Sequence, residues 1–116
     1  MSTEVGNTAE DLASAFLESQ GWKIIARNWR TRRCEIDIVA SSKDLIHIVE
    51  VKYRRNTAFG GGLDYITADK VRRLRNAAYT WTVAHQYRGD IQVDIVSVEG
   101  ALSQPTISIH QNVIES

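Results

Sequence analysis

Residues 35–53, EIDIVASSKDLIHIVEVKY, contain the two strand-like runs that decide the fold of this chain. The runs EIDIVA (35–40) and LIHIVEVKY (45–53) are rich in β-branched residues, and SSKD (41–44) is typical of a tight turn. They predict a β-hairpin. The register of a hairpin follows its turn, so a turn near residues 42 and 43 pairs positions whose numbers sum to about 85 to 87. Asp37 then lies opposite or next to Glu50.

Charged side chains interrupt the apolar pattern of this hairpin. Strand side chains alternate with period two, which puts Glu50 and Lys52 on the apolar face of the second run, while Asp37 lies between two isoleucines of the first. Buried charges must be neutralised, and two adjacent carboxylates repel each other. A divalent cation would relieve the repulsion, and a salt bridge from Lys52 to one or both acids is the alternative.

The flanking sequence predicts two helices and three further strands. Helical spacing of apolar residues covers 8–20 and 67–85, and strand-forming runs cover 22–28, 91–98 and 106–109. Asn7 or Thr8 would cap the first helix, and Gly21 would end it. A glycine-rich loop, FGGGLDY (59–65), precedes the second helix. The order α-β-β-β-α-β-β indicates an α/β (α+β) fold.

Three polar residues outside the hairpin also lie among apolar ones. Lys70 falls in the apolar stripe of the second helix and should point back toward the sheet, with snorkelling to water as the alternative. Glu10 borders the stripe of the first helix, where a capping box with Asn7 is the alternative. Asp94, in the run IQVDIVSV, would form an ion pair at the end of the sheet.

The net charge of zero conceals an uneven distribution. The chain has 14 basic and 14 acidic residues, but residues 27–75 hold twelve Lys and Arg against six Asp and Glu. The planar fork of arginine suits phosphate, so this segment favours a phosphate-bearing partner, with a solvated surface as the alternative. The clusters are Arg27, Arg30, Arg32 and Arg33; Lys52, Arg54 and Arg55; and Lys70, Arg72, Arg73 and Arg75.

Length and composition limit the class of protein. A chain of 116 residues buries enough surface to form a core without metal or disulfide staples. Cys34 has no partner for a disulfide, the first residues lack a signal-peptide pattern, and no apolar run reaches the roughly 20 residues of a membrane span. We therefore expect a single cytoplasmic domain over residues 1–116 with no membrane partner.

Seven motifs occur in one order along the chain: AEDLA (9–13), GWKIIARNWR (21–30), EIDIVA (35–40), VEVK (49–52), FG (59–60), TADK (67–70) and VDIV (93–96). This ordered set resembles the YraN-type family, which has a restriction-endonuclease-like, PD-(D/E)XK fold similar to that of Holliday junction resolvases. The resemblance covers about residues 6–99 and implies a central mixed sheet flanked by two helices. Gln92 and Val93 stand where the family usually has Arg-Phe.

The resemblance also implies a site. Asp37, Glu50 and Lys52 correspond to the D…E-x-K triad of that superfamily, and Lys70 to a basic residue of the second core helix. The implied catalytic residues are Asp37, Glu50, Lys52 and Lys70, and the implied ligands of Mg²⁺ or Mn²⁺ are Glu10, Asp37, Glu50 and the backbone carbonyl of Val51.

Phosphodiester hydrolysis needs an activated water and positive charge against the developing phosphorane, which this set provides. We predict a metal-dependent nuclease-like protein that acts on nucleic acid, DNA before RNA, including branched or structured substrates. A non-catalytic nucleic-acid-binding module and a protein–protein adaptor are the alternatives, and a homodimer is compatible with the sequence. The predicted phosphate contacts are Arg30, Arg32, Arg33, Arg54, Arg55 and Arg73.

Overall fold

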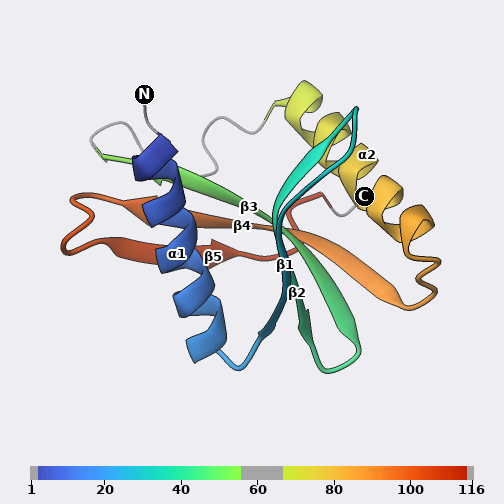
Figure 1. The fold of residues 1–116 in the computed structure, drawn as a ribbon, viewed down its shortest axis with the longest axis horizontal. Coiled ribbons are helices and arrows are strands. Elements are labelled where there is room, and N and C mark those ends of the chain that lie inside the picture. The colour runs from blue at the N-terminus through green and yellow to red at the C-terminus, as the bar shows by residue number, and fades with distance from the viewer. Residues whose placement is uncertain (1–2, 56–66, 115–116) are drawn as a thin grey trace.

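The chain forms a five-stranded sheet with two α-helices (Figure 1). The computed structural model describes residues 3–55 and 67–114, with side chains from Thr8 onward. The predicted loop at 59–65 lies outside the described residues. The elements are α1 (Thr3–Ser19), β1 (Lys23–Arg30), β2 (Glu35–Ser42), β3 (Leu45–Arg54), α2 (Ala68–Ala84), β4 (Asp90–Glu99) and β5 (Thr106–His110).

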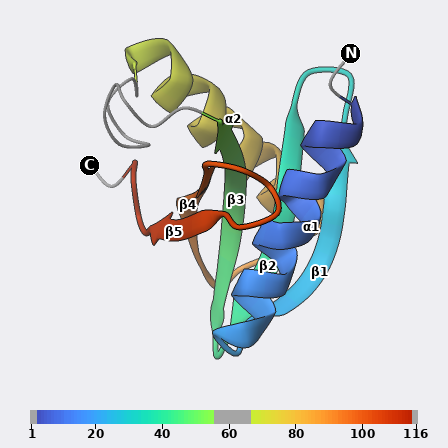
Figure 2. The ribbon, with the colours of Figure 1, turned by 90° about the vertical axis from the view of Figure 1, so that its left-hand side faces the viewer.

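The sheet is mixed, with the strand order β1-β2-β3-β4-β5. All neighbouring strands are antiparallel except β3 and β4, which are parallel and need the crossover that α2 provides. The helices pack on separate apolar clusters of the sheet (Figure 2): α1 packs through Ala9, Ala13 and Leu17, and α2 through Leu74 and Trp81. This confirms the predicted fold class. Neither helix, as far as the chain is described, is long and apolar enough to cross a membrane.

The two helices differ in how well their ends were predicted. Thr67 caps α2, because its Oγ1 accepts the backbone N–H of Lys70 at 3.1 Å, and His85 is the C-terminal cap. Both agree with the predicted range 67–85. The first helix begins at Thr3, so the predicted caps at Asn7 or Thr8 and the capping box of Asn7 with Glu10 are wrong. Asn and Thr favour caps but also occur inside helices at a cost below about 1 kcal/mol each, so their presence does not fix where a helix begins.

The hairpin of β2 and β3 has the predicted register. Lys43 and Asp44 form the turn, with Lys43 at φ 52°, and the pairs run from Ser42 opposite Leu45 to Ile38 opposite Val49. The numbers of each pair sum to 87, within the predicted range. Beyond Ile38 and Val49 the two strands diverge (Figures 1 and 2), and this fork carries the candidate site.

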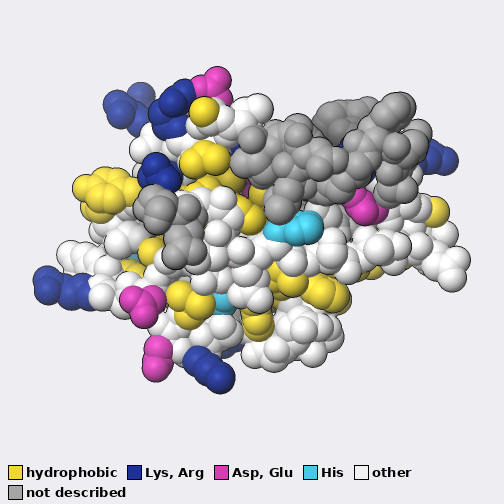
Figure 3. Space-filling model, turned by 180° about the vertical axis from the view of Figure 1, so that it is seen from behind, with side chains coloured by type: hydrophobic (Ala, Val, Ile, Leu, Met, Phe, Trp, Pro, Cys, Tyr) yellow, Lys and Arg dark blue, Asp and Glu magenta, His cyan; other side chains and the backbone are white. Residues whose placement is uncertain are grey.

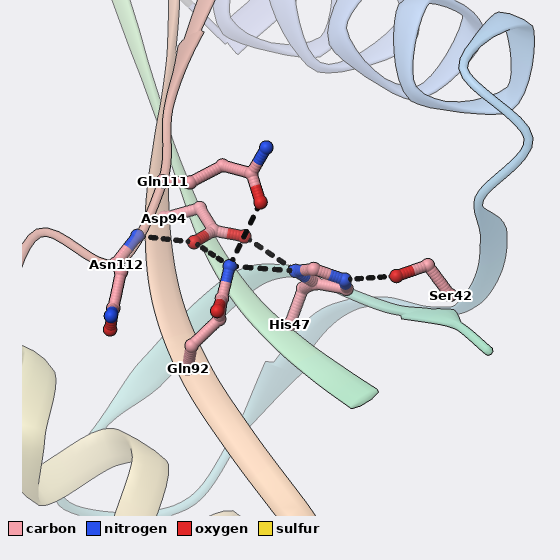
Figure 4. A network of polar contacts seen from close by, with 6 residues as sticks. All are labelled: Ser42, His47, Gln92, Asp94, Gln111 and Asn112. Atoms are coloured by element: carbon pink, nitrogen blue, oxygen red, sulfur yellow. Dashed lines mark hydrogen bonds and ion pairs between the residues drawn. The ribbon is translucent and has the colours of Figure 1, made fainter. Parts of the chain in front are cut away.

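A buried histidine lies on the α1 side of the sheet (Figure 4). His47 is 1% exposed, and its Nδ1 lies 2.6 Å from Oδ2 of Asp94. Its Nε2 lies 2.7 Å from Oγ of Ser42, and the ring of Trp22 stacks on it with centroids 3.6 Å apart. Asp94 therefore has a buried polar partner, His47, which no local pattern indicated; an ion pair at this position stays a prediction.

The other oxygen of Asp94 ties the C-terminal segment to the sheet. Oδ1 accepts the side-chain N–H of Gln92 at 2.9 Å and the backbone N–H of Asn112 at 2.8 Å. Gln92 also donates to Oε1 of Gln111 at 3.1 Å. One fully buried carboxylate thus joins β3, β4 and the segment that follows β5 (Figure 4).

Replacing Asp94 should therefore destabilise the whole fold. Asp94→Ala leaves His47, Gln92 and the N–H of Asn112 without their acceptor, and each buried group that loses its partner costs about 1 to 3 kcal/mol. We expect urea unfolding to show a loss of at least about 3 kcal/mol in the free energy of unfolding. The exposed Asp90→Ala, in the same strand, is the control and should change little. Equal midpoints for both variants would contradict this role.

Candidate active site

The fork between β2 and β3 is held by a side chain. The regular pairing ends at Ile38 and Val49, and Oδ2 of Asp37 accepts the backbone N–H of Val51 at 2.8 Å. In a continuous ladder a backbone carbonyl of β2 would accept the N–H of Val51. Here the side-chain carboxylate of Asp37 accepts it instead. This bond fixes Asp37 at the point where the strands separate.

Asp37 is an acid among acids. Burial is the largest cause that raises its pKa to about 6; the N–H of Val51 opposes the shift, and the charges of Glu50, Glu10 and Glu35 add to it. Among the described residues, the hydrogen bond from Val51 is the contact that stabilises the ionised form, and no lysine or arginine forms an ion pair with Asp37. Above about pH 6 Asp37 therefore carries a negative charge with no ion-pair partner among residues 3–55 and 67–114.

Glu50 has the opposite environment. Its Oε2 accepts a hydrogen bond from Nζ of Lys70 and lies 3.3 Å from Nζ of Lys52 and 3.7 Å from Nη2 of Arg73. Burial alone would raise the pKa of Glu50, but the hydrogen bond and charge of Lys70, with the charges of Lys52 and Arg73, lower it overall. Glu50 is consequently ionised, and three cations gather at one of its oxygens.

Lys70 reaches this acid from the first turn of α2. Its side chain is 14% exposed and points to the sheet, as predicted, rather than into water. Burial lowers the pKa of Lys70, and the hydrogen bond with Glu50 opposes that shift. The structure therefore brings the four predicted catalytic residues, Asp37, Glu50, Lys52 and Lys70, to one fork of the sheet.

Glu10 approaches the fork from α1. Its Oε1 is buried without a hydrogen bond, 3.6 Å from Nη2 of Arg27, whereas that nitrogen lies 2.8 Å from Oδ1 of Asp11. The charge of Glu10 contributes to the raised pKa of Asp37, so the two carboxylates are within electrostatic reach. This oxygen has an ion-pair contact with Arg27 but no hydrogen bond, so it keeps the capacity to accept one or to bind a cation.

The donor set fits Mg²⁺ or Mn²⁺ in its chemistry. No group of three or more Asp, Glu, His and Cys side chains in residues 3–55 and 67–114 is gathered to hold an ion in this conformation. Mg²⁺, however, keeps several waters and needs only one or two protein carboxylates. Asp37 and Glu50 supply these, and Glu10 adds an oxygen without a hydrogen bond. The ligand role of the carbonyl of Val51 stays a prediction.

The arginines predicted to contact phosphate differ in their freedom to do so. Arg30 forms an ion pair with Glu35 at 3.0 Å, and Arg54 is half-buried in β3. The β1–β2 connection is shaped by Oγ1 of Thr31, which accepts the backbone N–H groups of the two residues that follow Arg32. Five members of the set are exposed, all except Arg54: Arg30, Arg32, Arg33, Arg55 and Arg73.

One contact of the site was missed from the sequence. Arg73 was assigned to flanking phosphates, whereas here it also lies beside Glu50. The signal was present, because residues three apart on a helix are neighbours on its surface and Lys70 already pointed to the sheet. A helical position that shares a face with one site residue is a candidate for the same site.

Comparison with known proteins gives one consistent family. The model described as "Uncharacterised protein family UPF0102" matches residues 9–98. A UPF0102 protein of Myxococcus xanthus is 38% identical over 105 residues, covering 90% of this chain and 83% of the relative. Similar proteins of an Arthrobacter species (39% identical, 89% of each chain) and Renibacterium salmoninarum (41% identical, 82% and 81%) bear the same family name.

The raised pKa of Asp37 predicts how stability depends on pH. The folded state binds this proton with a pKa of about 6 against 3.8 for the ordinary group, so stability without metal is lost as pH rises through about 6. Asp37→Asn keeps an acceptor for Val51 and cannot ionise. In EDTA it should be about 2 to 3 kcal/mol more stable than the wild type at pH 8 and should approach it near pH 4.

Urea unfolding at the two pH values measures this difference. Asp44→Asn is the matched control, because this aspartate is exposed in the hairpin turn, and it should show no gain at pH 8. A gain for Asp37→Asn that is the same at both pH values would refute the explanation by ionisation.

Proposed function

The chain belongs to the UPF0102 family, and from the geometry of the fork we propose that it is a metal-dependent nuclease that hydrolyses phosphodiester bonds in nucleic acid. One observation carries the proposal. Two carboxylates of adjacent strands meet at the fork, and their environments differ: within the described part of the chain Asp37 has no cationic partner, whereas Glu50 is surrounded by Lys52, Lys70 and Arg73. Pairs of acids with pKa values pushed apart are typical of sites that perform acid–base or metal chemistry.

Each residue has a role that follows from its place. Asp37 and Glu50 would hold Mg²⁺ or Mn²⁺, and the buried oxygen of Glu10 would complete the site directly or through water. Such an ion, when bound, supplies an activated water and positive charge against the phosphate. The backbone bond from Val51 keeps the carboxylate of Asp37 at the fork before any ligand arrives, which limits reorganisation when the ion binds.

The cations around Glu50 would face the phosphate. Lys52 lies on the same strand face as Glu50, and its ammonium could orient the attacking water or stabilise the phosphorane oxygens. Lys70 and Arg73 come from α2 and would exchange their contact with Glu50 for one with the phosphate, since both are ligands for an anionic oxygen. Arrival of the substrate thereby frees Glu50 for the metal.

The exposed arginines supply contacts outside the cleavage site. Arg32 and Arg33 in the β1–β2 connection and Arg55 after β3 flank the fork along the chain. Their contacts with phosphates of DNA would be independent of base sequence and sensitive to salt. We favour DNA as the substrate and the cytoplasm as the location. The excess of basic residues is confined to residues 27–75 of a chain with zero net charge. This fits binding at a structured or branched site better than binding along any stretch of DNA through overall charge.

A second function has an observation of its own. Glu50 already has three cationic neighbours, and no set of three ligands is gathered within the described residues. A module that binds nucleic acid through Lys70 and the arginines, with the acids serving only to position these cations, would have the same geometry. Such a module binds without cleaving.

A cleavage assay separates the two functions. Incubation with supercoiled, branched and single-stranded DNA in Mg²⁺ or Mn²⁺ should yield products, and Lys52→Ala should lower the initial rate about 100-fold, as expected for loss of a charge that stabilises the transition state. Lys43→Ala, exposed in the hairpin turn, is the control and should cleave at the wild-type rate. Calorimetric titration with Mn²⁺ should detect binding to the wild type and none to Asp37→Asn. If the protein binds DNA but yields no cleavage product in either metal, the nuclease proposal is refuted and the non-catalytic binding module is the remaining function.

Salt dependence tests the arginine contacts. Each phosphate contact adds about 0.9 to the slope of log affinity against log salt for duplex DNA, so replacing both Arg32 and Arg33 with Ala should lower the slope by nearly 2. Fluorescence anisotropy over a range of salt concentrations measures it. Arg88→Ala, exposed after α2, is the control. An unchanged slope in the double variant would favour a protein partner for this surface.

A further inference from the structure

A second cavity lies along α2, away from the fork. It has a volume of about 570 Å³, within the range of ligand pockets, and lies between α2, β4 and the segment 112–114. Arg75, Tyr79 and Thr82 come from α2, Ile91 and Gln92 from β4, and Ile114 from the C-terminal segment. None of the four residues assigned to catalysis lines this cavity.

One wall of the cavity is fixed at three points. The segment 112–114, which follows β5, bonds to a side chain of the sheet, to the backbone of β4 and to α2, so the wall is held by two layers of the fold. The bonds are Asn112 N–H to Oδ1 of Asp94 (2.8 Å), Val113 N–H to the carbonyl of Val93 (2.9 Å) and Nη2 of Arg75 to the carbonyl of Ile114 (3.2 Å). The cavity therefore exists before a ligand enters.

The lining combines an aromatic ring, a cation and apolar side chains. The ring of Tyr79 is 69% exposed and is therefore accessible to a ligand. Arg75 offers a planar guanidinium beside it, and Ala78 and Ile91 are apolar. In the space-filling view from behind, hydrophobic and basic side chains lie next to each other at the α2 end of the molecule (Figure 3). A planar heterocycle that carries a phosphate matches this set.

We propose that this cavity binds one unpaired nucleotide of the substrate, with the base against Tyr79 and its phosphate at Arg75. The inference rests on the proposed function and gives it a substrate class. Arg75 lies five residues beyond Lys70, about 7.5 Å along the helix axis and about 140° around it, so a strand bound at Lys70 must bend around α2 to reach the cavity. A base can enter only after leaving its stack, which favours single-stranded or branched DNA over a continuous duplex.

Binding in EDTA tests the cavity without cleavage. Fluorescence anisotropy compares a short single-stranded oligonucleotide with a blunt duplex of the same sequence. Tyr79→Ala should weaken single-strand binding about tenfold, the loss expected when one stacked base loses its ring, and leave duplex binding unchanged. Tyr79→Phe should restore it. Val83→Ala is the control, because Val83 is exposed one turn further along α2 and does not line this cavity. Equal losses for both substrates, or no loss, would overturn the proposal.

A titration with AMP separates this proposal from the nuclease function. Millimolar AMP should shift the amide NMR signals of Tyr79 and Asn112 in the wild type and not in Tyr79→Ala, whether or not the protein cleaves DNA. If these shifts are absent, the proposal that the cavity binds a nucleotide is wrong, and the proposed nuclease function is not affected. AMP bound more tightly than the oligonucleotide also overturns it, because the ligand is then a free nucleotide. Loss of cleavage in Lys52→Ala with the shifts intact shows that the two sites act separately.

Discussion

The separation of β2 from β3 is the constraint on which the candidate site depends. Where the ladder stops, the N–H of Val51 needs an acceptor, and Asp37 provides it from the neighbouring strand. This bond holds a carboxylate in a place where burial and other acids oppose its ionisation. The helix over the fork brings Lys70 to Glu50, whereas no described cation pairs with Asp37. Asp37 and Glu50, which lie near each other on adjacent strands, therefore differ in acidity: the pKa of Asp37 is raised and that of Glu50 is lowered.

The raised pKa of Asp37 lowers the stability of the free protein at a site that we propose to be functional. Ionised Asp37 destabilises the free protein at neutral pH, because burial and the neighbouring acids outweigh the hydrogen bond from Val51. Proteins commonly tolerate such groups at sites of binding or catalysis, where a ligand later removes the cost. The His47–Asp94 pair is the opposite case, because every polar atom that faces Asp94 contributes a hydrogen bond or an ion pair. Asp94 has three side-chain or backbone partners, whereas Asp37 has only the N–H of Val51 among the described residues.

The features that sequence predicted are local ones. The turn at Lys43 and Asp44 sets the hairpin register, and Thr67 defines the start of α2, so Asp37, Glu50 and Lys70 could be brought together from short patterns. The start of α1 could not, because a residue that can cap a helix can equally lie inside one. The contact of His47 with Asp94 joins residues 47 apart and depends on the parallel register of β3 and β4, which no turn fixes.

The bond from Asn112 to Asp94 also bears on how the protein is made. Asp94 receives one of its buried hydrogen bonds from a residue near the end of the chain, and the parallel β3–β4 pair needs the whole crossover through α2 before it can form. Pairings of high sequence separation form late, and domains fold as units during synthesis. The core around His47 is therefore incomplete until the segment after β5 has folded back onto β4. Closure of this segment, rather than formation of the individual strands, completes this part of the fold.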